Sequence, residues 1–158
     1  MKRGGFLKRK TPLASKGSSD TAVIKDSIQA LLLAIVKLRD GGCILRGIPS
    51  HHCNGFKNDG DLILQADHLI TRANSATYAD PRLVVCVCKG AHGWKSLGSN
   101  RNKAQYDALV KTIIEPERVA LWEACERDSW RPHRTSLYDW KKEEAFLKTK
   151  LAAMQRVN

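Results

Sequence analysis

The sequence predicts an α+β fold that is mostly helical and forms one domain. Three observations indicate it: an early apolar pattern with helical spacing, two strand-like runs on either side of a polar loop, and capped helical segments in the second half of the chain. The chain has 158 residues, which is enough for one domain with its own hydrophobic core. We find no internal repeat and expect a single domain over residues 20–158.

The start of the chain contains an arm and then a helix. We expect residues 1–19 to be a disordered basic arm, because Lys and Arg are mixed there with Gly, Ser and Thr. Ser19 or Asp20 can cap a helix that runs to about Arg39 on helically spaced Ile, Leu and Val residues. The glycine pair that begins at Gly41 would end this helix, whose simplest role is core packing.

Two strands are expected in the middle of the chain. Residues 62–66 form the first strand and would present Asp67 and His68 at its far end. The β-branched run 83–87 forms the second strand, and the polar loop 70–82 separates the two. The glycine-rich stretch that follows leaves room for about two helical turns around the next histidine.

Three helices are expected in the C-terminal part, over residues 103–114, 116–126 and 137–156. Asn102 can cap the first of them, and Pro116 suits the first turn of the second. Ser136 and Asp139 have the spacing of a capping box that opens the third.

The composition favours an acidic polymer as the partner. Lys and Arg number 27 against 16 Asp and Glu, which gives a formal net charge of +11. A basic protein of this size gains affinity for nucleic acid by releasing the counterions of phosphates. The longest apolar run, residues 30–36, is far shorter than the ~20 residues of a membrane span. We expect DNA as the partner and no membrane association; a basic structural or assembly protein is the alternative.

The cysteines indicate a reducing compartment. There are five of them, an odd number that cannot pair completely within one chain. The basic start of the chain is followed by no apolar segment of the kind that a secretory signal contains. Reduced thiols or metal ligands are therefore favoured over disulfides, and we expect the protein to work in a cytosol.

The pair Asp67-His68 places a carboxylate and an imidazole at the expected end of the first strand. Adjacent strand residues point to opposite sides, so the two groups can take separate tasks. The carboxylate can hold a hard cation, and the imidazole can take a proton from water. A further histidine, His92, follows the second strand after the cysteine-containing stretch Cys86-Val87-Cys88. An Asp-His pair alone is a weak signal, but strand, Asp-His, loop, strand, cysteines and histidine in this order are seldom accidental.

This order of elements resembles the HNH endonuclease superfamily. The family core, called ββα-metal or His-Me finger, is a β-hairpin and a helix around one divalent ion. The resemblance implies such a core at about residues 62–96, with a preceding helix and several C-terminal helices. It implies that Asp67 and His92 are ligands of one catalytic Mg²⁺ or Mn²⁺ ion and that His68 is the general base. The implied activity is hydrolysis of phosphodiester bonds in DNA.

Within the superfamily, the chain is most similar to small recombination nucleases of lambdoid phages. The comparable residues are Gly98, Asn102 and Tyr106 for the NinG/Rap type, and Cys43, Ile48-Pro49 and Cys53-Asn54-Gly55 for the YbcO type. The likeness covers about residues 43–122. It implies branched recombination intermediates as substrates and the cytoplasm of a bacterial host as the location. A two-fold symmetric junction would favour a homodimer.

Two positions depart from the family pattern. The stretch Asp80-Pro81-Arg82 stands where the middle Asn of the motif would precede the second strand, so the task of orienting the base is unassigned. Ala91 stands where the second Cys of a Cys-x-x-Cys pair would be, so a four-cysteine zinc knuckle is incomplete. A structural Zn²⁺ could still be bound, with His51 or His52 as a substitute ligand, by Cys43, Cys53, Cys86 and Cys88. Their spacings match standard zinc sites poorly, and small buried thiols are the alternative.

Basic residues surround the expected centre in the sequence. Singly, each is a solvated charge, but together they would line a face that contacts the DNA backbone: Arg72, Arg82, Lys89, Lys95, Arg101 and Lys103. Trp94 lies beside the centre and could touch DNA by stacking.

These observations predict a divalent-metal-dependent DNA endonuclease. The alternative from another class is a non-catalytic, zinc-stabilised DNA-binding module. The pair Asp67-His68 favours the enzyme, because a binding module has no use for a base beside a carboxylate.

Overall fold

The structure is a computed structural model that describes residues 16–49, 51–96, 100–128 and 136–157. These residues form five α-helices, one 3-10 turn and a two-stranded antiparallel sheet, which confirms the predicted α+β class. The elements are α1 (Lys16–Asp40), β1 (Leu64–His68), η1 (Pro81–Leu83), β2 (Val84–Cys88), α2 (Lys89–Ser96), α3 (Asn100–Lys111), α4 (Pro116–Asp128) and α5 (Leu137–Val157). Residues 1–15 of the predicted arm lie outside the described residues, whereas 16–19 belong to α1.

The helical spacing of apolar residues produces one buried face on α1. Ile28, Leu32, Ile35 and Val36 are at most 1% exposed, as expected for positions three or four residues apart. The helix ends at Asp40, and the N–H of the next residue, Gly41, donates to the carbonyl oxygen of Lys37 at 3.1 Å. The φ angle of Gly41 is 67°, a left-handed conformation that a residue without Cβ adopts without strain.

The sheet is a single hairpin in which Leu64 pairs with Cys88 and His68 pairs with Val84. Strand β1 starts and ends two residues later than the predicted range 62–66, so Asp67 and His68 are its last two residues. The reason is that residues 62–63 pair elsewhere: Leu62 bridges Phe56, and the Ile63 N–H donates to the carbonyl oxygen of Gly55 at 2.8 Å. The Asp-His pair therefore belongs to the paired part of the hairpin, with Asp67 opposite Val85 and His68 opposite Val84.

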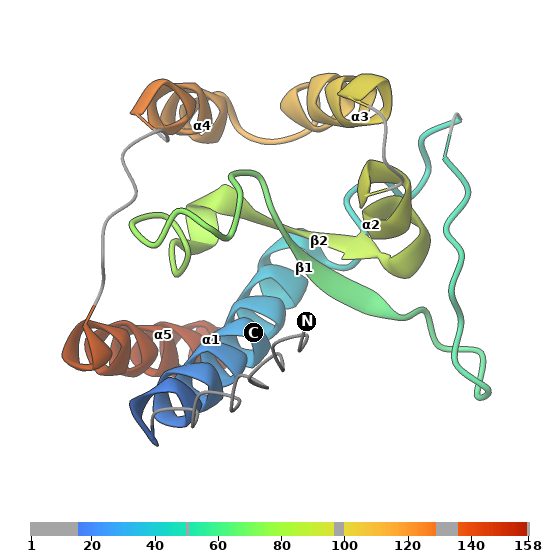
Figure 1. The fold of residues 1–158 in the computed structure, drawn as a ribbon. Coiled ribbons are helices and arrows are strands. Elements are labelled where there is room, and N and C mark those ends of the chain that lie inside the picture. The colour runs from blue at the N-terminus through green and yellow to red at the C-terminus, as the bar shows by residue number, and fades with distance from the viewer. Residues whose placement is uncertain (1–15, 50, 97–99, 129–135, 158) are drawn as a thin grey trace, which may run out of the picture.

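Helices cover both faces of this hairpin (Figure 1). Helices α1 and α5 lie side by side on one face and form a core cluster with Val84 and Cys86 of β2. Helices α2, α3 and α4 lie on the other face, where Tyr106 and Trp122 pack against Val85 and Val87. Every residue of β2 is therefore buried, and the alternation along the strand divides the core into two halves.

The C-terminal helices follow their sequence signals closely. Ser136 and Asp139 form the predicted capping box: the Asp139 N–H donates to Ser136 Oγ at 3.2 Å, and the Ser136 N–H donates to Asp139 Oδ2 at 3.0 Å. Helix α4 begins at Pro116 as predicted. Helix α3 begins at Asn100 and ends at Lys111, so Asn102 is not its cap. The helix ends before the predicted Ile114 because the chain tightens into turns: the Thr112 N–H donates to the carbonyl oxygen of Leu109 at 3.1 Å, and the Ile113 N–H donates to that of Val110 at 3.0 Å.

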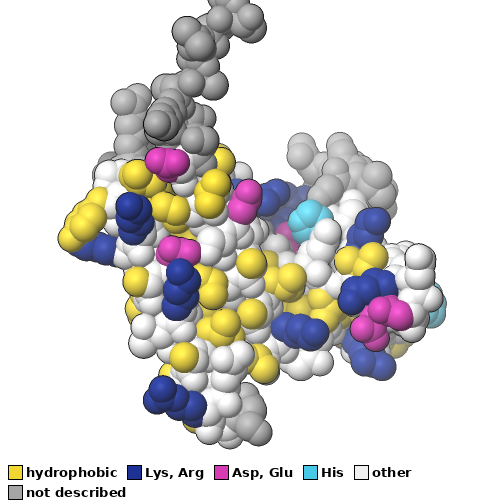
Figure 2. Space-filling model, turned by 90° about the horizontal axis from the view of Figure 1, so that it is seen from below, with side chains coloured by type: hydrophobic (Ala, Val, Ile, Leu, Met, Phe, Trp, Pro, Cys, Tyr) yellow, Lys and Arg dark blue, Asp and Glu magenta, His cyan; other side chains and the backbone are white. Residues whose placement is uncertain are grey.

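The side of the molecule formed by α1 and α5 carries mixed charge. Figure 2 shows that the Lys and Arg side chains of the described residues are spread among apolar and acidic ones on this side. None of the helices in the described part of the chain is both long enough and apolar enough to cross a membrane.

Candidate functional site

Asp67 lies at the centre of a polar network on the α2–α3 side of the sheet. Its carboxylate is buried, with a residue exposure of 3%. His92 of α2 places Nε2 at 3.7 Å from Asp67 Oδ1. The other oxygen, Oδ2, accepts hydrogen bonds from Lys95 Nζ at 2.9 Å and from the Tyr106 hydroxyl at 2.6 Å. The two residues that the family resemblance named as metal ligands are thus adjacent in space.

His68 projects from the opposite side of β1, as expected for a neighbour in a strand. Its Nε2 lies 3.0 Å from the carbonyl oxygen of Tyr78 and 3.3 Å from the side-chain amide nitrogen of Gln29, and these two contacts hold the ring in place. The carbonyl oxygen can only accept, so its contact favours a proton on Nε2 and Nδ1 as the basic nitrogen, whereas the Gln29 amide favours the opposite tautomer. Burial lowers the pKa of His68 and outweighs the opposing effect of the Tyr78 hydrogen bond. His68 is therefore a neutral imidazole at neutral pH, held in one orientation by the backbone.

Both residues open onto one cleft of about 310 Å³. His92 lines it, as do three of the predicted basic residues, Arg72, Lys95 and Lys103. Lys103 also pairs with Asp107 of the same helix. The cleft therefore combines a carboxylate, two imidazoles and several cations, which is a suitable surface for a phosphate group.

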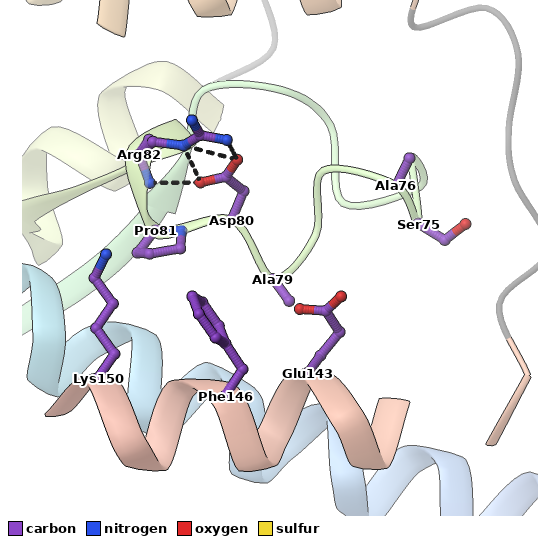
Figure 3. A pocket seen from close by; sticks show the side chains of 9 residues that line it. All are labelled: Ser75, Ala76, Ala79, Asp80, Pro81, Arg82, Glu143, Phe146 and Lys150. Carbon is purple, nitrogen blue, oxygen red and sulfur yellow. Dashed lines mark hydrogen bonds and ion pairs between the residues drawn. The ribbon is translucent and has the colours of Figure 1, made fainter. Parts of the chain in front are cut away.

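Arg82 lies elsewhere. Its guanidinium makes a two-pronged ion pair with Asp80, with Nη2 2.7 Å from Asp80 Oδ2. It faces a separate pocket of about 410 Å³ between the 75–82 segment and α5, where Phe146 and Lys150 lie opposite (Figure 3). The structure thus places Arg82 away from the Asp67 cleft, because η1 turns the chain just before β2.

The remaining predicted DNA contacts have different surroundings. Lys89 is exposed at the start of α2, outside the set of residues that line the cleft. Trp94 packs edge-on against Tyr106, with ring centroids 6.2 Å apart, and is partly buried against the core. Arg101 belongs to α3, but its side chain lies outside the described residues.

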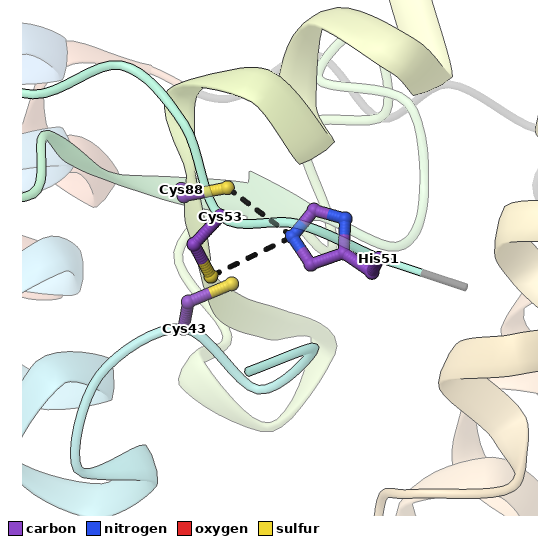
Figure 4. Close-up of side chains that lie close together, drawn as sticks. All are labelled: Cys43, His51, Cys53 and Cys88. Atoms are coloured by element: carbon purple, nitrogen blue, oxygen red, sulfur yellow. Dashed lines mark hydrogen bonds between the residues drawn. The ribbon is translucent and has the colours of Figure 1, made fainter. Parts of the chain in front are cut away.

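A second cluster of polar side chains lies at the other end of the hairpin. Cys43, His51, Cys53 and Cys88 converge so that their ligand atoms all lie within 4.8 Å of one another (Figure 4). His51 Nε2 is 3.6 Å from Cys53 Sγ and 3.4 Å from Cys88 Sγ. Tetrahedral ligands at ~2.3 Å for sulfur and ~2.0 Å for nitrogen are separated by about 3.6 Å, so the cluster could hold a metal such as zinc.

Backbone hydrogen bonds favour the thiolate form of Cys88. Burial alone would raise the pKa of Cys88, but N–H groups of Ala91 and Asn54 and the neighbouring thiols together hold that pKa below its ordinary value. The Ala91 N–H lies 3.4 Å from the Cys88 sulfur. Ala91, which lacks the thiol of the family pattern, thus contributes through its backbone, and burial and His52 lower the pKa of His51, which keeps it a neutral ligand.

The predicted zinc set is corrected at one position. Cys86 belongs to the opposite core cluster with α1, and His51 takes its place among the four. Residues 86 and 88 of a regular strand would point to the same side. Cys88, however, is the last residue of β2, where the chain turns into α2, and it belongs to the core cluster on the opposite side from Cys86. Burial followed by the charge of Asp40 raises the pKa of Cys86 to about 12, so this thiol stays protonated.

Some of the contacting residues gave no signal of their role in the sequence. The Tyr78 carbonyl is a backbone group in the 70–82 loop, and only the fold brings it to His68. Lys95 was expected on the DNA face, but it is an ion-pair partner of Asp67. The helical spacing of His92 and Lys95 on α2, three residues apart, could have indicated that both reach the same carboxylate.

Searches of protein-family models, of curated proteins and of solved structures found no match to this chain.

Proposed function

We propose that the protein is a divalent-metal-dependent DNA endonuclease whose centre is the Asp67 cleft. One observation carries the proposal: the carboxylate of Asp67 lies 3.7 Å from the imidazole of His92, next to His68, whose ring contacts the Tyr78 carbonyl oxygen. A carboxylate, an imidazole ligand and an oriented base are the groups that metal-assisted phosphodiester hydrolysis requires. The proposal agrees with the resemblance to the HNH superfamily.

The donor set fits a hard or borderline cation. Asp67 Oδ1 and His92 Nε2 would hold the ion. Adjacent donors of an octahedral site with ~2.1 Å bonds lie ~3.0 Å apart, so the 3.7 Å between these two atoms would shorten by ~0.7 Å when the ion binds. Mg²⁺ needs few protein ligands because it keeps several waters, and the imidazole also suits Mn²⁺. The ion would supply charge stabilisation for the phosphate and the leaving oxygen.

The side chains of this protein perform the other parts of the reaction. His68 takes a proton from the attacking water at Nδ1, and the Tyr78 carbonyl holds its ring in place through Nε2. Tyr106 fixes the rotamer of Asp67 by its hydrogen bond to Oδ2. Arg72 and Lys103 on the rim would bind flanking phosphates, which gives affinity for DNA without reading its sequence. Branched recombination intermediates are the proposed substrates, by the resemblance to phage nucleases.

A second candidate function is a zinc-stabilised DNA-binding module without catalysis. The four-ligand cluster of Cys43, His51, Cys53 and Cys88 favours it, because such a site stabilises a fold without any reaction. A zinc ion there would tie the 43–53 segment to the start of α2. The two functions are compatible, and only cleavage distinguishes the enzyme from the module.

The test is a nicking assay on linear, flapped and four-way DNA with Mg²⁺, Mn²⁺ or EDTA. We expect cleavage with either ion and none with EDTA. Asp67→Asn should lose cleavage, whereas the matched control Asp61→Asn should keep it, because Asp61 is an exposed surface carboxylate. Intact DNA under every metal condition, with DNA binding retained, would refute the enzyme and leave the binding module.

A further inference from the structure

The carboxylate of Asp67 already has a cation beside it. Lys95 Nζ lies 2.9 Å from Asp67 Oδ2 and donates a second hydrogen bond to the carbonyl oxygen of His68 at 2.6 Å. The Lys95 side chain is only 14% exposed, and its Nζ lies 5.2 Å from the centroid of the Tyr106 ring. This ammonium is therefore an enclosed part of the site and not an exposed surface charge.

The ion pair between Lys95 and Asp67 stabilises a negative charge inside the protein. An ionised carboxylate that is 3% exposed is unfavourable without a positive partner. Lys95 supplies that partner from α2, one helical turn after His92. A divalent ion between Asp67 Oδ1 and His92 Nε2 would share the carboxylate with the ammonium, and two cations at such close range repel each other strongly.

We propose that Lys95 is a built-in counter-ion that competes with the divalent metal for Asp67 and thereby keeps metal affinity low. The inference rests on the proposed function, since it concerns the same carboxylate. When the ion binds, the flexible Lys95 stem lets the ammonium move away from Oδ2 toward the cleft that it lines. Lys95 is thus a residue that sets the metal occupancy of the site and keeps it folded without the ion.

Titration with Mn²⁺ alone tests the inference, with the free ion followed by electron paramagnetic resonance on the zinc-loaded full chain. Lys95→Met removes the charge, and we expect Mn²⁺ to bind about tenfold more tightly or better. Lys95→Gln serves as a second uncharged variant that can still donate to both oxygens, with the same expected gain. Lys103→Met is the matched control: Lys103 lines the same cleft but pairs with Asp107, so its removal should change affinity by less than about threefold.

Asp67→Asn in the Lys95→Met background locates the ion, because it should remove the gain. An unchanged or weaker Mn²⁺ affinity in both uncharged variants would overturn the inference, and so would a gain that survives Asp67→Asn. The readout is separate from cleavage. If the uncharged Lys95 variants bind Mn²⁺ more tightly but the parent protein does not cleave DNA, the counter-ion is supported and the endonuclease is refuted. If the parent protein cleaves DNA but the parent and the Lys95 variants bind Mn²⁺ equally, the endonuclease is supported and the counter-ion is refuted.

Discussion

Two polar clusters lie at opposite ends of the same hairpin, and α2 connects them. At one end, four ligand atoms from Cys43, His51, Cys53 and Cys88 converge, and three of these residues are thiols. At the other end, Asp67 faces His92 on one oxygen and is held by Lys95 and Tyr106 on the other. Cys88 lies directly before α2, whereas His92 and Lys95 lie within it.

Under the proposed function, the two clusters would separate a permanent ion from an exchangeable one. A closed set of soft ligands suits a structural zinc ion that never leaves. The Lys95 ammonium at the other cluster neutralises the Asp67 carboxylate, so the proposed site would be stable before a metal ion binds.

The largest expected effect is loss of the structural metal. Cys88→Ala removes one of four ligands and should reduce the zinc content from one equivalent per chain to far below it, with a large loss of thermal stability. Structural zinc contributes on the order of 10 kcal/mol in small zinc domains. Elemental analysis and thermal denaturation measure both effects. Cys86→Ala is the matched control, because that thiol faces α1; equal zinc loss in the two variants would contradict the assignment.

A strong pH dependence of zinc affinity should follow from the protonated thiols. Burial raises the pKa of Cys53 to about 12 and also raises the pKa of Cys43. Without metal, both thiols therefore carry protons at neutral pH, and zinc must displace them. Because zinc displaces two protons, its apparent affinity should rise by up to ~100-fold for each unit by which the pH increases. The affinity should be lost as the pH falls. Competition with a chromophoric chelator between pH 6 and 8 measures it; a flat profile would exclude thiol ligation.

Gly90→Ala should weaken the connection between the clusters. A methyl group at Gly90 would lie 1.5 Å from Oδ1 and 2.4 Å from Cγ of Asn54, so the Asn54 side chain, next to the Cys53 ligand, must move away from α2. We expect a stability loss of about 1–3 kcal/mol and weaker zinc binding. Gly93→Ala is the control in the same helix, because a methyl there meets nothing within 4 Å and should stabilise the helix slightly. Chemical denaturation compares the two, and equal stabilities would disprove the close approach.

The smallest effect is expected on DNA affinity. The double variant Arg72→Ala/Lys103→Ala removes two cations from the cleft and should weaken binding severalfold, with a salt slope lower by about 1 to 2. Arg82→Ala removes one cation from the other pocket and should leave the slope nearly unchanged. Fluorescence anisotropy over a salt series measures both; a larger change for Arg82→Ala would place the DNA on the α5 side.

Local signals predicted most of the fold, and long-range contacts explain what they missed. Helical spacing, the Ser136–Asp139 capping box and Pro116 set the helices, because each acts within a few residues. The β1 boundary was wrong because Leu62 and Ile63 pair with the 55–56 turn, a choice that strand propensity does not encode. The zinc set was wrong at Cys86 for a similar reason: the turn after Cys88 breaks the strand parity.

At the candidate site, too, the sequence indicated some residues and not others. Asp67, His68 and His92 were identifiable as a group because two strands of a hairpin bring their ends together. The partners of these residues were not identifiable in the same way. The Tyr78 carbonyl is a backbone group without a sequence signature, and Lys95 looked like one of many basic residues in a chain with a net charge of +11.

The most direct test of the central claim is single-turnover cleavage by His68→Ala beside the parent protein. His68→Ala removes the proposed base and leaves the Asp67–His92 pair in place, so DNA should bind with parental affinity and be cut ~10²–10⁴-fold more slowly. His52→Ala, which removes an exposed histidine outside both clusters, should cut at the parental rate. Cleavage by folded His68→Ala at the parental rate would contradict the account, because no base at this position would then be needed.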